Sequence, residues 1–200
     1  MRLFMKKNIL IITQKVDKKD SILGFFHAWI EEFSKHFTFV TVICLQKGAV
    51  NLPNNVSVFS LGKETKGGRI SYIYNFYRYI FSFRKNYDVV FVHMNPIYVI
   101  LGGIFWRLFG KHIALWYTHK HVDMKLRVAE RLTHKIFTAS KESFRLPSRK
   151  LMVVGHGIDT EKFKPDFHVH DEKCFSVITV GRISPVKNYE IIIEAIARLK

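Results

Sequence analysis

Short apolar runs of four to six residues alternate along this sequence with longer segments in which apolar residues recur at helical spacing. In a parallel sheet each strand is buried on both faces, so it reads as a continuous apolar run, and the connecting helices cover those faces. No internal repeat or low-complexity tract interrupts the pattern. The pattern therefore predicts an α/β fold with a parallel sheet and helices on both faces.

The same pattern assigns most of the chain to individual elements. We predict strands at residues 8–13, 39–45, 56–60, 88–93, 112–117, 135–140 and 151–155. We predict one helix that begins near residue 25, after a polar loop at 14–21, and further helices at 69–85, 96–109 and 124–133. Pro96 in a first turn and Gly110 just beyond a last turn are typical helix boundaries.

A polar stretch that contains a proline, residues 164–172, is the predicted linker between two domains. Residues 1–163 contain all the strands named above and form the first, Rossmann-like domain. Residues 173–200 begin a new strand-loop-helix pattern. Because one strand and one helix cannot bury a sheet face by themselves, we expect this segment to be the truncated start of a second Rossmann-like domain.

The charge of the chain indicates anionic partners. Thirty-two Lys and Arg residues against sixteen Asp and Glu residues give a formal net charge of +16. Such an excess attracts phosphates, anionic lipids or nucleic acid over a long range. The excess is uneven, since residues 107–150 contain eleven basic and three acidic residues. We therefore expect a local basic face.

The cysteines and the apolar segments indicate in which cellular compartment we expect the chain. Cys44 and Cys174 each lie in an apolar run, so we expect reduced core thiols rather than a disulfide or a metal cluster. The amino-terminal apolar stretch is too short for a signal peptide. The longest apolar segment, residues 89–117, is broken by polar residues and contains no run of about 20 apolar residues. We expect a cytoplasmic chain that does not cross a membrane.

The turn after the first predicted strand lacks the G-x-G-x-x-G fingerprint of dinucleotide-binding proteins and supplies only Gly24. This disfavours an enzyme that uses NAD. Gly24 at a helix start could offer backbone N–H groups to a phosphate of the donor. It could equally be a glycine that eases the turn, and the sequence leaves both interpretations open.

Two motifs near the carboxyl-terminal end indicate a class of protein. The first comprises Gly157, Ile158, Asp159, Phe163 and Pro165, and the second comprises Gly181, Arg182 and Lys187. Together they resemble the crossing motif, [NH]-G-[VI]-D with a following Phe-x-Pro, and the V-G-R-[LI]-x-x-x-K motif of the family 4 retaining glycosyltransferases, which have the GT-B fold of two Rossmann-like domains. The resemblance extends over essentially the whole chain, as an amino-terminal domain plus the start of the donor-binding domain.

This resemblance implies transfer of a sugar from a nucleotide-diphosphate sugar to an acceptor, with retention at the anomeric carbon. It places Arg182 and Lys187 at the donor diphosphate, where fixed cations stabilise the leaving group without a metal ion or other cofactor. In the family a Glu-x7-Glu element that holds the donor lies farther along the chain, and Glu190 and Glu194, four residues apart, do not replace it. We therefore expect the 200-residue chain to be inactive by itself.

Histidines and one glycine complete the predicted site. The resemblance places His119, at the end of a predicted strand, at the donor sugar or among the active-site polar residues, and we assign it a catalytic role. His93, at another strand end, and Gly157 are predicted to line the cleft, although for His93 a satisfied histidine beneath a loop is the favoured interpretation. The spacing of His121, like that of His168 and His170, could suit a metal, but we predict no metal site because no third ligand is evident.

The predicted helix at 69–85 has a narrow polar stripe surrounded by aromatic and aliphatic residues. That is more apolar surface than one contact with a sheet requires. This helix resembles those of family members with lipid-linked acceptors, in which basic and aromatic elements rest on anionic lipid. We therefore expect a lipid-linked or glycan acceptor of a cell-envelope polysaccharide and a peripheral position at the inner membrane face. A deeply buried helix is the alternative.

Two other functions remain open at this stage. A non-catalytic basic module that binds anionic membrane or nucleic acid would fit the charge, but RNP-like motifs are missing and the crossing motif would be unexplained, so we expect no nucleic-acid partner. Another GT-B enzyme, such as a sugar-nucleotide epimerase, would share the fold, and the G-R-x4-K loop argues against it.

Overall fold

The chain divides into two units. The computed structural model describes residues 7–161, 163–164, 177–181 and 183–198. The internal contacts separate Met1–Gly157 from Ile158–Lys200. The linker predicted at 164–172 lies outside the described residues except for Lys164, so the domain boundaries predicted there stay a prediction.

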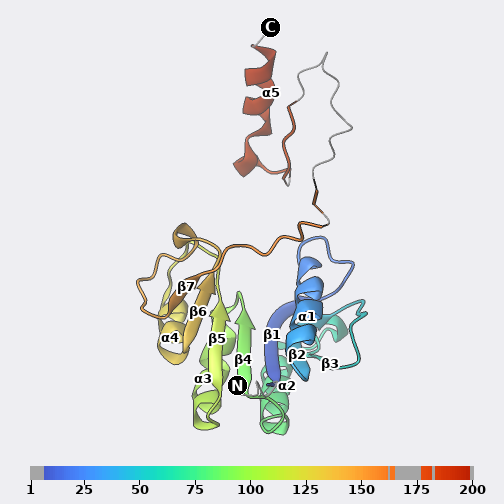
Figure 1. The fold of residues 1–200 in the computed structure, drawn as a ribbon, viewed down its shortest axis with the longest axis vertical. Helices are drawn as coiled ribbons and strands as arrows, with labels where there is room; N and C mark the ends of the chain where they lie inside the picture. Colours follow the sequence, from blue (N-terminus) through green and yellow to red (C-terminus); the bar gives the residue numbers. More distant parts are fainter. Residues whose placement is uncertain (1–6, 162, 165–176, 182, 199–200) are drawn as a thin grey trace, which may run out of the picture. The chain divides into compact units, whose positions relative to one another are not determined.

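The first unit is built on a seven-stranded sheet in which every paired strand is parallel to its neighbour, in the order β3-β2-β1-β4-β5-β6-β7 (Figure 1). The strands are β1 (Ile9–Val16), β2 (Val40–Lys47), β3 (Val56–Ser60), β4 (Val89–His93), β5 (His112–Trp116), β6 (Lys135–Thr138) and β7 (Leu151–Val153). All seven strands predicted in this region are present. The first unit is thus an α/β, Rossmann-like domain.

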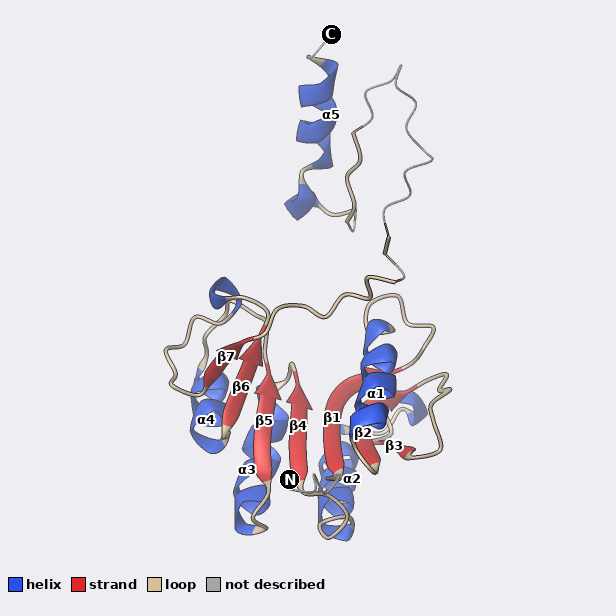
Figure 2. Ribbon diagram, viewed as in Figure 1, coloured by secondary structure: helices blue, strands red, loops and turns tan. Residues whose placement is uncertain are grey.

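Helices cover both faces of the sheet, but unequally (Figure 2). The helix α1 (Phe25–His36) packs on one face, and α2 (Arg69–Ser82), α3 (Pro96–Leu108) and α4 (Met124–Leu132) pack on the other. The strands supply both layers because successive side chains point to opposite faces. In β1, Ile9 and Ile11 join the α1 layer, whereas Leu10 and Ile12 join the layer of the other three helices.

Local sequence signals set the helix boundaries. The Asn95 side chain accepts a hydrogen bond from the Ile97 backbone N–H at 3.2 Å, Pro96 occupies the first turn of α3, and Gly110 follows the helix with a φ of +69°. Asp123 caps α4 by accepting from the Leu126 N–H at 2.8 Å. Within the described residues, no helix is long and apolar enough to span a membrane.

Several predicted boundaries were wrong. The strands β6 and β7 end at Thr138 and Val153 rather than at residues 140 and 155. The strand β1 continues through Val16, where we predicted a loop from residue 14, because Lys15 and Val16 keep their pairing with β2. The helix α2 ends at Ser82 rather than residue 85, where the chain turns toward β4. Residues 177–181, predicted as part of a strand, form none, since no described neighbouring strand supplies the hydrogen bonds that a strand needs.

The described part of the second unit is a loop followed by a helix. A 3-10 turn at Pro185–Lys187 leads through Asn188, which has a φ of +47°, into α5 (Tyr189–Ala197). Ile191 and Ile193 of this helix are exposed, as are Glu190 and Glu194. Cys44 is buried in the first unit, where burial raises its thiol pKa to about 12, and Cys174 lies outside the described residues.

The helix α2, for which the sequence left open an exposed apolar surface or deep burial, is half-exposed in the first unit. It buries Phe76 and Ile80 against the sheet and leaves Ile70, Tyr74 and Phe81 exposed. The deeply buried alternative is therefore wrong for this helix in the first unit. Its outer apolar residues face away from the core of that unit.

Two isoleucines of α2 offer a matched test of this packing. Ile80 is 0% exposed and Ile70 is 86% exposed. Ile80→Ala should lower the free energy of unfolding by about 2–5 kcal/mol, because it removes buried methylene groups and leaves a cavity. Ile70→Ala should change it by less than about 0.5 kcal/mol. Urea denaturation of both variants provides the measurement, and equal losses would contradict the packing described here.

Candidate functional site

The strand order reverses between β1 and β4, since β2 and β3 extend from β1 on one side and β5 to β7 extend from β4 on the other. In open α/β sheets, ligands bind outside the carboxyl ends of the strands at such a reversal. We call this side of the sheet the carboxyl edge. The predicted site residues of the first unit all lie on it or on the loops that leave it.

His93 is the last residue of β4 and lies at the reversal itself. Its side chain is buried, its Nδ1 lies 3.2 Å from the hydroxyl of Thr13 on β1, and its ring stacks on Phe26 of α1 with a centroid distance of 4.0 Å. Burial lowers the pKa of His93 to about 4. His93 is therefore a neutral imidazole near pH 7 that joins β1, β4 and α1 within the buried interior of the first unit.

Met94, the next residue, has an uncommon backbone conformation with a φ of +63°. Its N–H donates to the Trp116 carbonyl oxygen at 2.8 Å, and its sulfur accepts from the Thr118 hydroxyl at 3.2 Å. The Asn95 N–H turns back to the His93 carbonyl oxygen. These contacts fix the turn after β4 against the loop after β5, which is the loop that contains His119.

His119 lies in the loop that follows β5 and is exposed. Its Nδ1 accepts a hydrogen bond from the His121 N–H at 3.2 Å, and this contact does not involve Nε2. The ring lies 6.4 Å from the ring of Tyr117, and the Tyr117 hydroxyl donates to the His121 carbonyl oxygen. The loop is thus held in shape while the imidazole of His119 stays accessible to a ligand.

The loop between β1 and α1 is held by a carboxylate of the protein. Asp20 accepts from the backbone N–H groups of Ile22 and Leu23 at 2.9 and 2.7 Å and from the ammonium group of Lys15. The Lys15 contact, followed by the two N–H groups, lowers the pKa of Asp20 to about 2. In dinucleotide-binding folds a phosphate receives such N–H groups. Here an internal carboxylate receives them.

Gly24 has a local structural reason to be glycine. Its N–H donates to the Asp20 carbonyl oxygen at 3.1 Å, and a Cβ at this position would clash with that oxygen. Its own N–H is therefore engaged within the loop. The assignment of Gly24 to the donor phosphate stays a prediction, and this packing explains the glycine without it.

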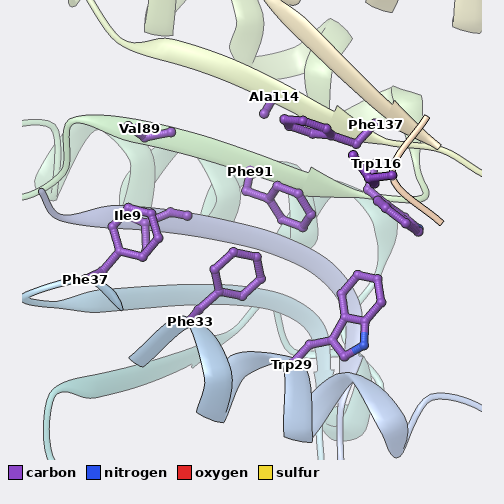
Figure 3. A pocket seen from close by; sticks show the side chains of 10 residues that line it. Ile9, Trp29, Phe33, Phe37, Val89, Phe91, Ala114, Trp116 and Phe137 are labelled. Carbon is purple, nitrogen blue, oxygen red and sulfur yellow. The ribbon is translucent and has the colours of Figure 1, made fainter. Parts of the chain in front are cut away.

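An apolar groove runs along the face of the sheet beside α1 (Figure 3). It has a volume of about 370 Å³ and is lined by Ile9, Trp29, Phe33, Phe37, Val89, Phe91, Ala114, Trp116, Phe137 and Val154. Its walls offer no hydrogen-bonding side chain apart from the indole groups, so a nucleotide diphosphate would be poorly solvated there. Gly157 borders a smaller pocket of about 270 Å³ beside Trp29 and Glu32, and a Cβ at this position would meet open space. Its assignment to the cleft stays a prediction.

In the second unit the structure describes one of the two predicted cations. Lys187 is exposed, and its Cε lies 3.8 Å from the position that a Cβ on Gly181 would occupy. A Cβ there would also lie 2.7 Å from the Tyr189 hydroxyl, so a larger residue would require the Tyr189 side chain to move. Arg182 lies outside the described residues. The motif thus brings Gly181, Lys187 and Tyr189 together at the start of α5.

The described residues contain no group of three His, Cys, Asp or Glu side chains arranged to hold a metal ion. His121 contacts His119 at a ring distance of 6.5 Å, and no third residue of a ligand type joins them in this part of the chain. His168 and His170 lie outside the described residues.

The sequence analysis missed several residues that shape this edge. Thr13 and Phe26 hold His93, and their separation of 80 and 67 positions from it gives no local signal. The backbone of Met94 also has no sequence signal, because the residue is neither Gly nor Asn. Asp20 could have been recognised, since an Asp shortly before a helix often accepts from the following N–H groups.

Comparisons with solved structures find several proteins with a similar fold. HepE of Anabaena in complex with UDP and glucose matches 96% of this chain and 58% of its own with a TM-score of 0.59 at 15% identity. MurG of Acinetobacter baumannii matches 80% of this chain and 48% of its own, with a TM-score of 0.51 at 13% identity. A UDP-N-acetylglucosamine 2-epimerase matches 83% and 53%, with a TM-score of 0.51 at 11% identity.

These similarities concern the fold. The chain spans about half the length of the solved structures that it matches. No protein-family model and no curated protein matches the sequence. The matches agree with the α/β, Rossmann-like architecture of the first unit.

The burial of His93 predicts a pH-dependent stability. Its pKa is about 4 in the folded chain against an ordinary 6.5, so between these values the unfolded chain binds a proton that the folded chain does not. The free energy of unfolding should therefore rise by about 3 kcal/mol between pH 4 and pH 6.5 and stay level above that. Urea denaturation across this range should show the rise in the wild type and its loss in His93→Gln. Parallel pH curves for the two proteins would contradict the assignment.

Proposed function

We propose that this chain is the acceptor-side domain and the start of the donor-binding domain of a family 4 glycosyltransferase of the GT-B fold. The reaction is transfer of a sugar from a nucleotide-diphosphate sugar, with retention, to a lipid-linked or glycan acceptor of the cell envelope. The observation that supports it most is the match over 96% of the chain to HepE, whose structure holds UDP and glucose. The G-R-x4-K loop and the crossing motif support the same assignment.

The proposed chemistry divides between the two units. Arg182 and Lys187 bind the donor diphosphate, and their positive charges stabilise the negative charge that develops as the diphosphate leaves. His119 contacts the donor sugar or the reacting acceptor hydroxyl through the accessible Nε2. Its loop is held against the turn after β4 by the contact between Thr118 and Met94. His93 and Gly157 shape the floor and rim of the cleft on the acceptor side.

A sugar-nucleotide epimerase is the second candidate, because a UDP-N-acetylglucosamine 2-epimerase shares the fold with a TM-score of 0.51. The two functions differ in their products. A transferase joins the sugar to an acceptor and releases a nucleoside diphosphate, whereas an epimerase inverts one carbon of the intact sugar nucleotide. Release of UDP that depends on an acceptor would separate them.

We further propose that the outer faces of α2 and α3 rest on an anionic membrane. The two helices contact one another through Phe81 and Phe105, whose ring centroids lie 5.0 Å apart. Beside that contact, Ile104 and Leu108 of α3 are 58% and 76% exposed. The surface also includes exposed Ile70, Ile73, Tyr74, Arg78, Arg84, Lys85 and Arg107. An exposed apolar surface with interspersed cations is typical of a protein that rests on anionic lipid.

Sugar transfer should require a complete donor-binding domain. We expect the 200-residue chain alone to neither transfer sugar nor hydrolyse UDP-sugars, since only part of one cleft wall is present. In a protein in which residues 1–200 are continued by a full second domain, Arg182→Ala and Lys187→Ala should each lower turnover by roughly 10²-fold. Steady-state kinetics would measure this, with the fold checked by circular dichroism.

A charge-matched control makes the kinetic test specific. Lys135→Ala removes an exposed cation at the first residue of β6, at the end of the sheet opposite the carboxyl edge, and should leave turnover unchanged. Turnover near the wild-type value in both Arg182→Ala and Lys187→Ala would refute the assignment of these residues to the diphosphate.

Membrane association gives a separate prediction. Each cation near an anionic surface contributes about 1 kcal/mol, so several acting together should give reversible binding that salt weakens. In flotation assays the chain should bind vesicles that contain phosphatidylglycerol and should not bind vesicles of phosphatidylcholine alone. Arg84→Gln/Lys85→Gln should weaken the binding, and Lys18→Gln/Lys19→Gln should have a smaller effect. Equal binding to both vesicle types, or to neither, would refute this surface.

A further inference from the structure

A second group of cations lies on the carboxyl edge, away from the α2–α3 surface. It consists of Lys120, in the loop after β5, and Lys141 and Arg145, in the loop after β6. The two loops leave the same edge because β5 and β6 are parallel and Trp116 pairs with Phe137. All three side chains belong to exposed residues. We call these three residues the edge cations.

Tyr117 holds the two loops together. Its ring lies 6.4 Å from that of His119 in one loop and 6.0 Å from that of Phe144 in the other. Its backbone N–H donates to the Phe137 carbonyl oxygen of β6 at 3.0 Å, and its hydroxyl donates to the His121 carbonyl oxygen. One buried aromatic side chain thus fixes the loop that contains Lys120 beside the loop that contains Lys141 and Arg145.

The acidic residues nearby already have local roles. Asp123 caps α4 through the Leu126 N–H. The pKa of Glu142 lies below its ordinary value, first because of a hydrogen bond from its own N–H and one from Ser140, and further because of the positive charges of Lys141 and Lys120. No edge cation forms a salt bridge within 4.0 Å in the part of the chain that the structure describes. The local balance is therefore positive at the end of the sheet where ligands bind.

We propose that the edge cations bind a phosphate group of the acceptor, beside His119. Three cations from two loops can surround a phosphate, which offers several oxygens and up to two negative charges, whereas a carboxylate would engage a single arginine. The inference rests on the proposed function only in taking the bound anion to be part of the acceptor. It specifies that the acceptor is anionic close to the hydroxyl that receives the sugar.

Phosphate binding can be measured without any sugar donor. Inorganic pyrophosphate, added at constant ionic strength to the 200-residue protein, should shift the backbone amide NMR signals of residues 119–121 and 141–145 saturably. Lys120→Gln/Lys141→Gln/Arg145→Gln should weaken the binding at least about tenfold, because each lost contact is a charge-assisted hydrogen bond. The matched control is Lys7→Gln/Lys135→Gln/Arg149→Gln, which removes three exposed cations next to the opposite ends of the strands and should change the affinity less than about twofold.

Two results would overturn the proposal. One is equal weakening by both triple variants, which would show general attraction to a basic protein. The other is pyrophosphate binding that leaves the signals of the two loops unmoved, or no binding at all. Circular dichroism of both variants checks that they fold.

Vesicle flotation identifies the source of the phosphate. If it belongs to a lipid headgroup, the edge variant should bind phosphatidylglycerol vesicles more weakly than the wild type, in addition to losing pyrophosphate binding. If it belongs to a soluble or chain-linked acceptor, the edge variant should float like the wild type while pyrophosphate binding is lost. Both results support the site and assign its ligand.

The proposal and the proposed function can fail separately. Phosphate binding at the two loops without any sugar transfer by a protein with a complete second domain would refute the function and leave the anion site. Transfer to a phosphate-bearing acceptor with an unchanged KM in the edge variant would leave the function and refute the site.

Discussion

The packing of β1 and β4 side by side is the contact on which the rest of the first unit depends. Both strands are buried between two helical layers, and their pairing places Ile9 opposite Val89 and Ile12 opposite Val92. The strand order reverses at this pair, so the carboxyl ends of β1 and β4 diverge into loops that leave in different directions. His93 joins the two strands at this point through Thr13 and Phe26.

Two groups of hydrogen-bond donors and cations on the first unit differ in whether a carboxylate of the protein already binds them. At the start of α1 the N–H groups of Ile22 and Leu23 are satisfied by the carboxylate of Asp20, which a diphosphate would have to displace. At the ends of β5 and β6 the edge cations are exposed and, among the described residues, form no salt bridge within 4.0 Å, although Lys141 and Lys120 interact electrostatically with Glu142. This difference supports our proposal that the first unit receives an anionic acceptor and that the second unit binds the nucleotide.

Much of the fold could be predicted from the sequence, because apolar runs and helical spacing report burial directly. All seven strands and the positions of α1 to α4 follow from that pattern, and Pro96 and Gly110 mark the boundaries of α3. The end of β1 could not be predicted in this way. Its last residues include polar Gln14 and Lys15, and pairing with β2 extends the strand past the apolar run.

The site was less predictable, because its residues meet only through the fold. His119 and His93 could be proposed as strand ends, but the burial of His93 depends on Phe26 and Thr13, which are far away in sequence. The grouping of Lys120 with Lys141 and Arg145 depends on the parallel pairing of β5 with β6 and on the ring of Tyr117. Sequence spacing reports neither contact.

The central proposal is that the acceptor binds at the carboxyl edge of the first unit and the sugar nucleotide at the loop before α5, and hydrogen–deuterium exchange tests it most directly. The protein with a complete second domain would be compared with and without a UDP-sugar and a phosphate-bearing acceptor. The account predicts slower exchange in residues 117–123, 140–145 and 181–188, with no change at the opposite ends of the strands. Protection confined to those opposite ends, or none at saturating ligand, would contradict it.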